Sequence, residues 1–517
     1  MTIYYVARAG GDNTNPGTEA LPWQSINKAA WTAIAGDTVY VQEGIYNERL
    51  IPQNSGTPGN WITFSAAPGT AKDSVIIDGT GIICPYLEGL VYINGKSHIK
   101  VSGFRIQYAK GTVNKSGSGI SVRGLMIPFS YITLENNHIY DTMNSGIEVC
   151  GAGHHITINK NELEYGQNAP HPMWENEGLS VGSETGGVDN VVISNNHVHH
   201  DALWMNNTDS INKNRTDYGG AFITLKDGTT NAWVFGNEVD HIGSWWDWSA
   251  GIYLGAYTGI LNTINVYNNY IHDIPGVGIE VTYEQGAPFP SRSVQDIKIF
   301  NNLIFNGDLA PGRSKMGMRI APPHTPAEGI VKNILIINNT IYGLQYGIMA
   351  GASLLSSNIR VRNNLVVDNT VQQMYCYEAR VAIDHNLVFG IAPGNIGTFP
   401  VLTDPRLVHP LLNDFHLQST SPAIGAGSIT EAPTLDFEGK VRNMPPSIGA
   451  FEYGSIPVCI PSWQCDVPFN GYEDDGCGNR QLNAACNPPE TASIPSALIW
   501  GIGIAALYTL YKFSTKR

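Results

Sequence analysis

The chain has 517 residues, of which 14% are charged, and its formal net charge is −14 at pH 7. This acidic balance argues against nucleic acid as a partner, since a phosphate backbone needs a basic face. The 56 glycines favour β structure with many tight turns, and the length suits an elongated repeat domain with appendages.

The chain begins with MTIYYVARAGG, which reads directly as a strand. No signal peptide precedes this strand. Export would therefore require a start that has been trimmed or misplaced, or a route other than ordinary secretion, as in a virion.

An Asn-Asn-x-apolar signature repeats along the middle of the chain. Full copies (NNHI, NNHV, NNYI, NNLI, NNTI and NNLV) begin at 136, 195, 268, 301, 338 and 363. Weaker copies (KNEL, GNEV and HNLV) begin at 160, 236 and 385. Successive copies lie 24, 35, 41, 32, 33, 37, 25 and 22 residues apart. A base period near 22–25 residues with insertions in the middle predicts a solenoid.

Each period holds short β-branched strands, as in ITLENNHIY and INVYNNYIH. Asparagine repeated at a bend indicates stacked turns, in which side-chain amides bond to the next coil. Over about residues 90–390 these repeats resemble the right-handed parallel β-helix proteins of the pectate-lyase-like superfamily. The resemblance implies an all-β fold, a right-handed parallel β-helix or solenoid.

The flanking segments extend the resemblance. Residues 1–89 resemble the N-terminal cap and first coils of such proteins, with a short helix around 25–35 that covers the open first coil. Residues 391–453 include DFHLQSTSPAIGAGS and DFEGKVRNMPPSIGAFEY, and they resemble the closing segment of anchored secreted β-helix proteins. Both ends of a solenoid need covers because bare strand edges invite aggregation.

A second repeated element, Gly-apolar-x-apolar, follows the Asn motifs. In GIEVTYEQG (278–286) the apolar residues alternate with polar ones, which puts the polar set on the outer face. Aligned by glycine, the outward row reads Glu148, Ser180, Phe222, Tyr253, Glu280, Arg319 and Met349. A row of mostly small residues follows, and then a third row of Ala152, Glu184, Lys226, Tyr257 and Glu284. This face is predicted to form a shallow trough with aromatic and charged walls.

Insertions gather on both sides of this strand column, and loops on a rigid scaffold commonly carry function. HPMWENEG, DALWMNNTDSINKNRTDYGG and GSWWDWS bring tryptophans beside the predicted trough. Exposed indoles suit the apolar faces of pyranose rings, whereas any single tryptophan can instead pack its loop onto the solenoid. The substrate-binding candidates are Glu184, Phe222, Glu284, His324, Trp174, Trp204, Trp245, Trp246 and Trp248.

Two chemistries are considered for the trough. Glycoside hydrolysis usually needs two carboxyls about 5–9.5 Å apart. Glu280 and Glu284 would lie about 13 Å apart along one strand. A loop carboxylate would have to complete the pair, such as Glu175, Glu177, Asp227 or Asp247. A polyuronide lyase needs a base for the proton next to the uronate carboxylate and a cation that neutralises this carboxylate.

The resemblance to β-helix lyases implies a Lys or Arg base, often with calcium held by acidic residues. The catalytic candidates are Lys226, Arg319, Tyr253, Tyr257 and Glu280. Glu280 and Glu284 are the calcium candidates, since hard cations prefer several oxygen ligands. The alternative is that Lys226 with Glu184, and Arg319 with Glu280, form ordinary ion pairs across stacked strands.

A second polar row follows the Asn motifs. On neighbouring coils it can bind a metal, although such columns are more often turn residues that bond to neighbouring backbone. The row comprises Tyr140-Asp141, His199-His200-Asp201, Asp240-His241 and His272-Asp273.

Residues 454–490 are expected to form a small Cys-rich module. They contain Cys459, Cys465, Cys477 and Cys486 without the paired CxxC of most zinc ribbons, which favours two disulfides and an oxidising compartment over a metal. Residues 491–517 hold an uncharged run at 494–511 and then a basic tail. This pattern predicts a transmembrane or sorting helix with its C-terminus inside; the alternative is a buried helix.

Together these features predict an extracellular or cell-surface β-helix, anchored by its C-terminal segment, that engages a polysaccharide. Polyuronide-lyase-like β-elimination is the leading chemistry. The alternatives are a β-helix glycoside hydrolase and a non-catalytic glycan-binding adhesin or virion spike. The expected partners are a polysaccharide, acidic if the chemistry is elimination, and a membrane, with calcium as the candidate cofactor. A homo-oligomer is compatible with each reading.

Overall fold

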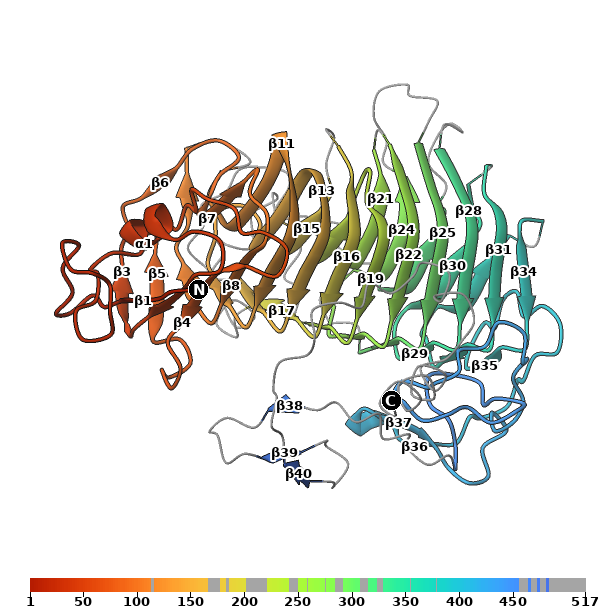
Figure 1. Ribbon diagram of the computed structural model, residues 1–517. Coiled ribbons are helices and arrows are strands. Elements are labelled where there is room, and N and C mark those ends of the chain that lie inside the picture. Colours follow the sequence, from red (N-terminus) through yellow and green to blue (C-terminus); the bar gives the residue numbers. More distant parts are fainter. Residues whose placement is uncertain are drawn as a thin grey trace, which may run out of the picture.

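The computed structural model describes most of residues 1–454. The described part excludes 113–115, 166–176, 183–185, 201–220, 241–249, 258, 275, 284–291, 307–314, 323–328, 354 and 378, and after 454 it includes only 464–465, 472–474 and 480–482. Figure 1 shows an elongated stack of parallel coils with the N-terminal cap at one end.

Helix α1 (Ile26–Thr32) is the short helix expected around 25–35. The Ser25 hydroxyl caps it by accepting a hydrogen bond from the Lys28 N–H at 3.2 Å. Ile26, Ala29 and Ala30 are buried in the same core as the first strands, so one face of the helix covers the first coil.

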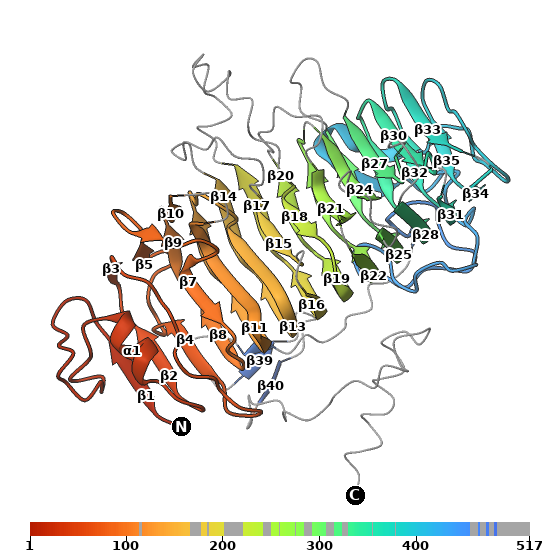
Figure 2. The same ribbon diagram turned by 90° about the horizontal axis from the view of Figure 1, so that it is seen from above.

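Three runs of parallel strands follow the stack, and we call them the first, second and third sheets. The first sheet contains β7 (Gly89–Asn94), β11 (Ser118–Glu135), β13 (Ile147–Asn159), β15 (Leu179–Val181), β18 (Ile223–Leu225), β21 (Ala250–Ala256), β24 (Val277–Tyr283), β27 (Met316–Ile320), β30 (Tyr346–Ala350) and β33 (Gln372–Cys376). Figure 2 shows most of these strands side by side from above.

The second sheet shares the long strands β11 and β13 with the first. Its other strands are β1 (Ile3–Val6), β2 (Thr38–Val41), β4 (Ile62–Ala66), β8 (Ile99–Ser102), β16 (Val188–Ser194), β19 (Thr230–Phe235), β22 (Ile260–Tyr267), β25 (Arg292–Phe300), β28 (Gly329–Ile337), β31 (Ser357–Arg362) and β34 (Val381–Asp384).

The third sheet follows the bend after the second sheet, and from Asn137 onward this bend carries the Asn motif. Its strands are β3 (Gly44–Tyr46), β5 (Val75–Asp78), β9 (Arg105–Gln107), β12 (His138–Tyr140), β14 (Glu162–Tyr165), β17 (His197–His200), β20 (Glu238–Asp240), β23 (Tyr270–His272), β26 (Leu303–Phe305), β29 (Thr340–Tyr342), β32 (Leu365–Val367) and β35 (Leu387–Phe389).

Short elements complete the described chain. They are β6 (Ile83–Cys84) with β10 (Lys110–Gly111), β36 (Leu407–His409) with β37 (Asp414–Leu417), the 3₁₀ turn η1 (Pro410–Leu412), and β38 (Gln464–Cys465), β39 (Tyr472–Asp474) and β40 (Arg480–Leu482).

The second asparagine of each motif belongs to one buried ladder. The Asn302 Oδ1 accepts from the Asn269 N–H at 3.1 Å and from its Nδ2 at 2.9 Å, while the Asn302 Nδ2 donates to the Asn339 Oδ1 at 2.9 Å. The prediction that side-chain amides join successive coils is thus confirmed. The ladder, at most 1% exposed, comprises Asn137, Asn161, Asn196, Asn237, Asn269, Asn302, Asn339, Asn364 and Asn386.

The interior of the coils is one apolar core that extends from Val6 to Val388. The alternation expected in GIEVTYEQG is confirmed, because Ile279, Val281 and Tyr283 all belong to this core. The outward residues of β24 are buried as well, so something other than bulk water surrounds this strand on both faces.

The closing segment packs against the outer face of the third sheet. Leu407, Phe415 and Ile448 form a second core with Phe305 and Leu365. In Figure 1 this segment lies beside β29 and β35. The segment therefore covers the side of the last coils.

The C-terminal predictions fall largely outside the described residues. The hydrophobic run at 494–511 is outside, as are the side chains of the four clustered cysteines. Within the described part, no helix is both long and apolar enough to cross a membrane. Cys84, Cys150 and Cys376 are free thiols, and all three are buried.

Candidate functional site

The outward row of the first sheet assembles four polar or aromatic side chains on successive coils. The strand register aligns Thr224 of β18 with Tyr253, then Glu280 and then Arg319. Neighbouring parallel strands lie about 4.8 Å apart, so the row spans roughly 14 Å. The same row includes Glu148 and Ser180 on one side and Met349 on the other, as predicted.

The predicted place of Phe222 in this row is wrong. Phe222 lies in register with Gly178 and Gly251, as its backbone hydrogen bonds show, and Thr224 takes the outward position. Phe222 is 6% exposed and belongs to the main core, so it does not line the trough. The sequence GAFI imitates the repeated Gly-apolar pattern two residues too early.

Lys226 also lies one row closer to the centre than predicted. Leu225, which precedes Lys226, is paired with Leu254, which precedes Gly255. Lys226 therefore lies opposite Gly255, in the small-residue row. The Lys226 Nζ lies 2.8 Å from the Glu177 Oε1, and these side chains are 23% and 12% exposed. Glu177, just before β15, was expected only as a loop carboxylate that could complete a hydrolytic pair, and its contact with Lys226 was not predicted.

The Tyr253 ring lies across Gly255. A Cβ at position 255 would lie 2.3 Å from the ring and 2.8 Å from the phenol oxygen, so glycine makes room for the ring. Because Gly255 is opposite Lys226 on the next coil, the phenol lies over the small-residue row beside the lysine. Tyrosine and lysine thus share one edge of the outward face.

Tyr257 lies in the turn after β21. The Asp227 carboxylate, from the turn after β18, accepts hydrogen bonds from the Tyr257 N–H at 2.7 Å and the Gly259 N–H at 3.1 Å. Asp227 is 4% exposed. These two hydrogen bonds fix the Tyr257 backbone beside the row and give Asp227 a structural role.

Glu280 and Arg319 form a two-pronged ion pair. The Arg319 Nε lies 2.9 Å from one Glu280 oxygen, and its Nη2 lies 2.7 Å from the other. The ion pair expected as the alternative reading is therefore present, but it is not a surface pair, because the Glu280 side chain is 1% exposed. With both oxygens facing a guanidinium, Glu280 is poorly placed to bind calcium.

A similar pair lies four coils earlier. The Arg123 Nη2 is 2.5 Å from the Glu148 Oε2, and the Ser118 hydroxyl and the Asn144 amide also donate to this oxygen. Glu148 was predicted to lie outward, whereas Arg123, two positions beyond the row on β11, was not identified. The outward row therefore contains two buried carboxylates, each with an arginine.

The remaining predicted site residues lie outside the described residues. They are Glu184, Glu284, His324, Trp174, Trp204, Trp245, Trp246 and Trp248. The Glu184 partner predicted for Lys226, the second calcium candidate and the tryptophan wall thus stay predictions.

The outer face of the third sheet contains a ladder of diagonal histidine–carboxylate pairs. Each pair joins the residue directly after the second asparagine of one coil to a residue two positions further along on the next coil. The pairs are His138–Glu164 at 3.0 Å, Glu162–His199 at 3.5 Å, His197–Asp240 at 3.0 Å and Glu238–His272 at 3.3 Å. Only His199, Asp240 and His272 were singled out in the sequence, although the third and fifth letters of NNHIY, KNELE, NNHVH and GNEVD carry the signal.

These pairs move the protonation equilibria of their members. Histidine partners hold the pKa of Glu162, Glu164 and Glu238 below the usual range, the hydrogen bond from His199 being the main cause for Glu162. Burial alone would lower the pKa of His272, but Asp273 and Glu238 outweigh it and raise this pKa to about 9. Glu162, Glu164 and Glu238 therefore stay ionised and His272 keeps its proton at neutral pH.

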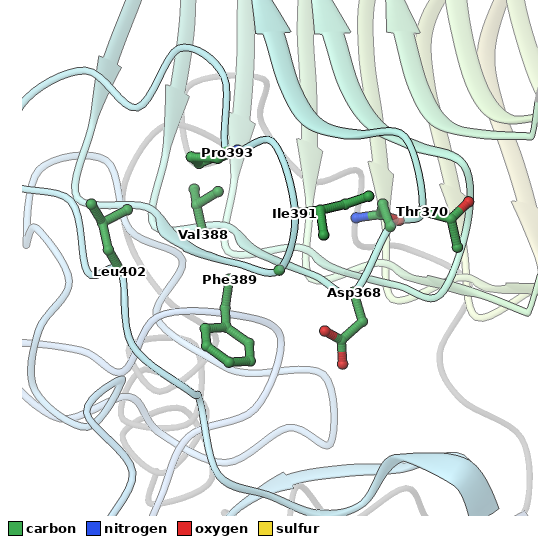
Figure 3. Close-up of a pocket in the computed structure, with 9 residues that line it drawn as sticks. Asp368, Thr370, Val388, Phe389, Ile391, Pro393 and Leu402 are labelled. Atoms are coloured by element: carbon green, nitrogen blue, oxygen red, sulfur yellow. The ribbon is translucent and has the colours of Figure 1, made fainter.

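A pocket of about 590 Å³ lies elsewhere, at the C-terminal end of the third sheet. Figure 3 shows its lining, in which Val388, Phe389, Ile391 and Leu402 are apolar and Asp368 supplies the carboxylate. Burial raises the pKa of Asp368, and Asp404 raises it further. This pocket shares no residue with the trough.

Three comparisons place the chain among known proteins. Residues 4–222 match a family model described as "Pel9A-like, right handed beta helix region". The curated "Uncharacterized protein YwoF" of Bacillus subtilis (strain 168) is 27% identical over 380 residues, which cover 71% of this chain and 74% of the relative.

Among solved structures, pectate lyase Pel9A is 15% identical, with a TM-score of 0.49 over 87% of this chain and 96% of that chain. The complex of XylC with xylose is 14% identical, with a TM-score of 0.44 over 87% and 98%. The GH136 lacto-N-biosidase from Eubacterium ramulus is 15% identical, with a TM-score of 0.45 over 77% and 65%. These three likenesses carry no argument on their own. From its strand register and the match over residues 4–222, the chain is a right-handed parallel β-helix protein with a Pel9A-like β-helix region.

Proposed function

We propose that the protein is a polysaccharide-active β-helix enzyme that cleaves an acidic glycan by β-elimination. The observation that carries this proposal is the Tyr253 phenol lying over Gly255, on the coil next to Lys226. An amine and a phenol on neighbouring coils of one outward face supply a proton acceptor and a proton donor for one substrate. Arg319 lies two coils beyond Tyr253 and supplies a second positive charge.

In the proposed reaction Lys226 removes the proton next to the uronate carboxylate. The C–O bond to the leaving sugar breaks as a carbon–carbon double bond forms, and Tyr253 protonates the departing oxygen. For this step Lys226 must enter as a neutral amine, having lost its proton to solvent. Glu177, whose Oε1 lies 2.8 Å from the Lys226 Nζ, positions the amine and stabilises the ammonium that forms when it takes the proton. Arg319, oriented by Glu280 on both prongs, faces the uronate carboxylate.

Hydrolysis is less well supported by the described carboxylates. Glu148 and Glu280 lie four coils apart, roughly 19 Å, against the roughly 5–9.5 Å that glycoside hydrolysis needs. Each is also paired with an arginine. These same buried pairs favour the second candidate function, a glycan binder without catalysis, since they leave a rigid outward face of fixed charge.

The proposal includes a surface location with the C-terminal segment as anchor. It rests on the uncharged run at 494–511, the basic tail and the clustered cysteines. Calcium remains a proposed cofactor through loop carboxylates such as Glu284 rather than through Glu280. Addition of a chelator to the active protein tests this part, with loss of turnover expected.

The decisive experiment incubates the full chain with a panel of uronic-acid polymers. Ultraviolet absorbance reports the conjugated double bond of elimination, and a reducing-end assay reports any cleavage. We expect both signals to rise together on at least one polymer. Reducing ends without the absorbance would establish hydrolysis, and binding without either signal would establish a lectin-like binder.

Variants then test the site. Lys226→Ala and Tyr253→Phe should each lower kcat by roughly 10²–10⁴-fold, the usual contribution of a general acid or base. Gly255→Ala should do the same indirectly, because its Cβ displaces the Tyr253 ring. Lys332→Ala, on β28 of the second sheet, is the matched control and should stay fully active. Full activity of both Lys226→Ala and Tyr253→Phe would refute the site.

A further inference from the structure

The third sheet brings two imidazoles and a carboxylate together on its outer face. His197 and His199 are two residues apart on β17, so both point outward, and Glu162 pairs with His197 across the strands. One ligand atom from each of these three residues lies within 4.8 Å of the others. This cluster lies on a different sheet from the proposed trough and has no part in the proposed reaction.

From this geometry we infer that Glu162, His197 and His199 form a binding site for a divalent transition metal of the zinc type. Two imidazole nitrogens with one carboxylate oxygen form a donor set that zinc prefers, whereas calcium requires mostly oxygen. Water is free to complete the tetrahedron, since none of the three side chains is fully buried.

The spacing within the cluster supports a shared ion. The His199 Nε2 lies 3.5 Å from the Glu162 Oε1, which is long for a hydrogen bond. Bonds of about 2.0–2.1 Å at a tetrahedral angle place two zinc ligands about 3.3 Å apart. The pair is therefore already close to the separation that a common ion imposes.

Neighbouring groups hold these ligands in place. The Lys72 Nζ lies 2.6 Å from the Glu162 Oε2, and the other oxygen, Oε1, faces His199. Asp240 lies 3.0 Å from the His197 Nε2, the kind of carboxylate–histidine contact that orients metal ligands. The two rings are stacked at 4.1 Å, so one must turn before both nitrogens converge, and His197, 38% exposed, has the room.

The adjoining clusters are weaker candidates. His138, Glu162 and Glu164 provide a single imidazole, and that ring already lies 3.1 Å from Asp73 and 3.0 Å from Glu164. His197, Glu238 and Asp240 likewise provide one imidazole. Zinc is therefore assigned to the cluster with two.

The test is calorimetric titration of zinc chloride into the full chain, purified without a histidine tag and stripped of metal. We expect one zinc ion to bind per chain at this site. His199→Ala and Glu162→Gln should each lower the zinc affinity by more than the roughly 10–100-fold that loss of an outer partner causes. Asp240→Asn, which removes such an outer partner, should lower the zinc affinity about 10-fold. His409→Ala, an exposed histidine in the closing segment, is the matched control.

A second readout guards against misfolding. Saturating zinc should raise the thermal midpoint of the wild-type protein but not that of His199→Ala, because a ligand stabilises only the state that binds it. Calcium at equal concentration should not distinguish the wild-type protein from His199→Ala, because the proposed calcium ligands lie away from this cluster. Unchanged zinc affinity in His199→Ala, or a loss in His138→Gln that exceeds the loss in His199→Ala, would overturn the assignment.

Discussion

Glu280 lies at the centre of the outward row, and its carboxylate is paired with Arg319. The carboxylate is 1% exposed, and both of its oxygens face the guanidinium at 2.7–2.9 Å. Breaking a buried pair leaves one charge in a poorly solvated place, which costs roughly 3–5 kcal/mol. Replacing both partners with apolar groups is often neutral, because neither charge remains to be solvated.

Glu280→Gln should therefore lower the free energy of unfolding by roughly 3–5 kcal/mol. The double variant Glu280→Leu with Arg319→Met should recover much of this loss. Denaturant titration followed by circular dichroism measures each variant. The control is Lys100→Met, whose partner Glu135 lies 2.6 Å away in a half-exposed pair, and it should change stability by less than about 1 kcal/mol. If the losses in the free energy of unfolding from the Glu280 and Arg319 substitutions simply add in the double variant, the ion pair is not the cause of the loss.

His416 makes the closing segment sensitive to pH. Its Nδ1 lies 2.6 Å from Asp414 and its Nε2 lies 3.0 Å from Glu438, which itself lies 2.7 Å from Lys440. Burial alone would lower the His416 pKa, but the two carboxylates outweigh it and raise the pKa above its usual value. The folded state therefore binds the His416 proton more tightly than the unfolded state does.

The stabilisation from His416 should be fully present below about pH 6.5, the ordinary histidine pKa, and should be lost as pH rises through the raised value. The thermal midpoint of the wild-type protein should thus fall relative to that of His416→Leu between pH 6 and pH 9. Parallel midpoints over that range would show that His416 does not titrate there. His385→Leu, whose ring faces Asp384 at 2.9 Å, controls for loss of a histidine elsewhere.

Single residues were the least predictable part of the site. Glu280, Arg319 and Tyr253 could be placed because strict alternation follows a clear glycine. Phe222 could not, because an insertion precedes it and the residue at the glycine position is the phenylalanine itself. Ion-pair partners such as Glu177 come from other coils, and no periodicity within one strand identifies them.

At the scale of elements, the Asn bend joins the second and third sheets. The buried asparagine of each coil accepts from the preceding coil and donates to the next, so each side chain satisfies several buried groups. Removal of one asparagine side chain leaves hydrogen-bonding groups on both neighbouring coils without a partner. Each buried polar group left unpaired costs about 1–3 kcal/mol.

Asn302→Ala should therefore destabilise the protein by more than 2 kcal/mol, on the order of two unpaired groups. Asn302→Asp should not restore stability, because a carboxylate lacks the Nδ2 donor that reaches Val266 and Asn339. Asn195→Gly is the control: Asn195 is exposed at φ 55°, which glycine adopts freely, so a change within about 0.5 kcal/mol is expected. Hydrogen exchange localises the effect, with fastest opening expected in β23 to β29.

The elements themselves were largely predictable. Periodic asparagines indicated the coils, and β-branched alternation indicated the strands on either side. The histidine–carboxylate ladder was overlooked in part because the two members of each pair belong to different coils, 26 or more residues apart in sequence. Only the stacking register makes them neighbours.

At the scale of the whole molecule, the closing segment shows where prediction from sequence ended. Its likeness to closing segments indicated a cover for the solenoid, and the structure shows it against the side of the third sheet. The asparagines that precede the ladder help to hold it: Asn301 donates to Leu435 at 2.8 Å, and Asn363 donates to Ser428 at 2.8 Å. Such contacts join residues 65 or more positions apart, which a local pattern cannot reveal.

Arg442 connects this segment to the solenoid. Its Nη2 donates to the Asn301 Oδ1 at 2.8 Å and to the Gly449 and Ala450 carbonyls at 2.9 Å, and burial lowers its pKa to about 10 despite the nearby Glu452. At neutral pH the guanidinium stays charged, so its removal leaves the buried Glu452 carboxylate and several carbonyls without this cation.

Arg442→Met should therefore release the closing segment before the coils open, because a solenoid repeat depends mainly on its nearest neighbours. Hydrogen exchange should accelerate at 407–452 and stay slow in β18 to β27, where the proposed trough lies. Arg406→Met, an exposed arginine of the same segment, should leave exchange unchanged. Equal acceleration along all coils would mean instead that the segment and the solenoid unfold as one cooperative unit, and that the trough depends on a cover at its far end.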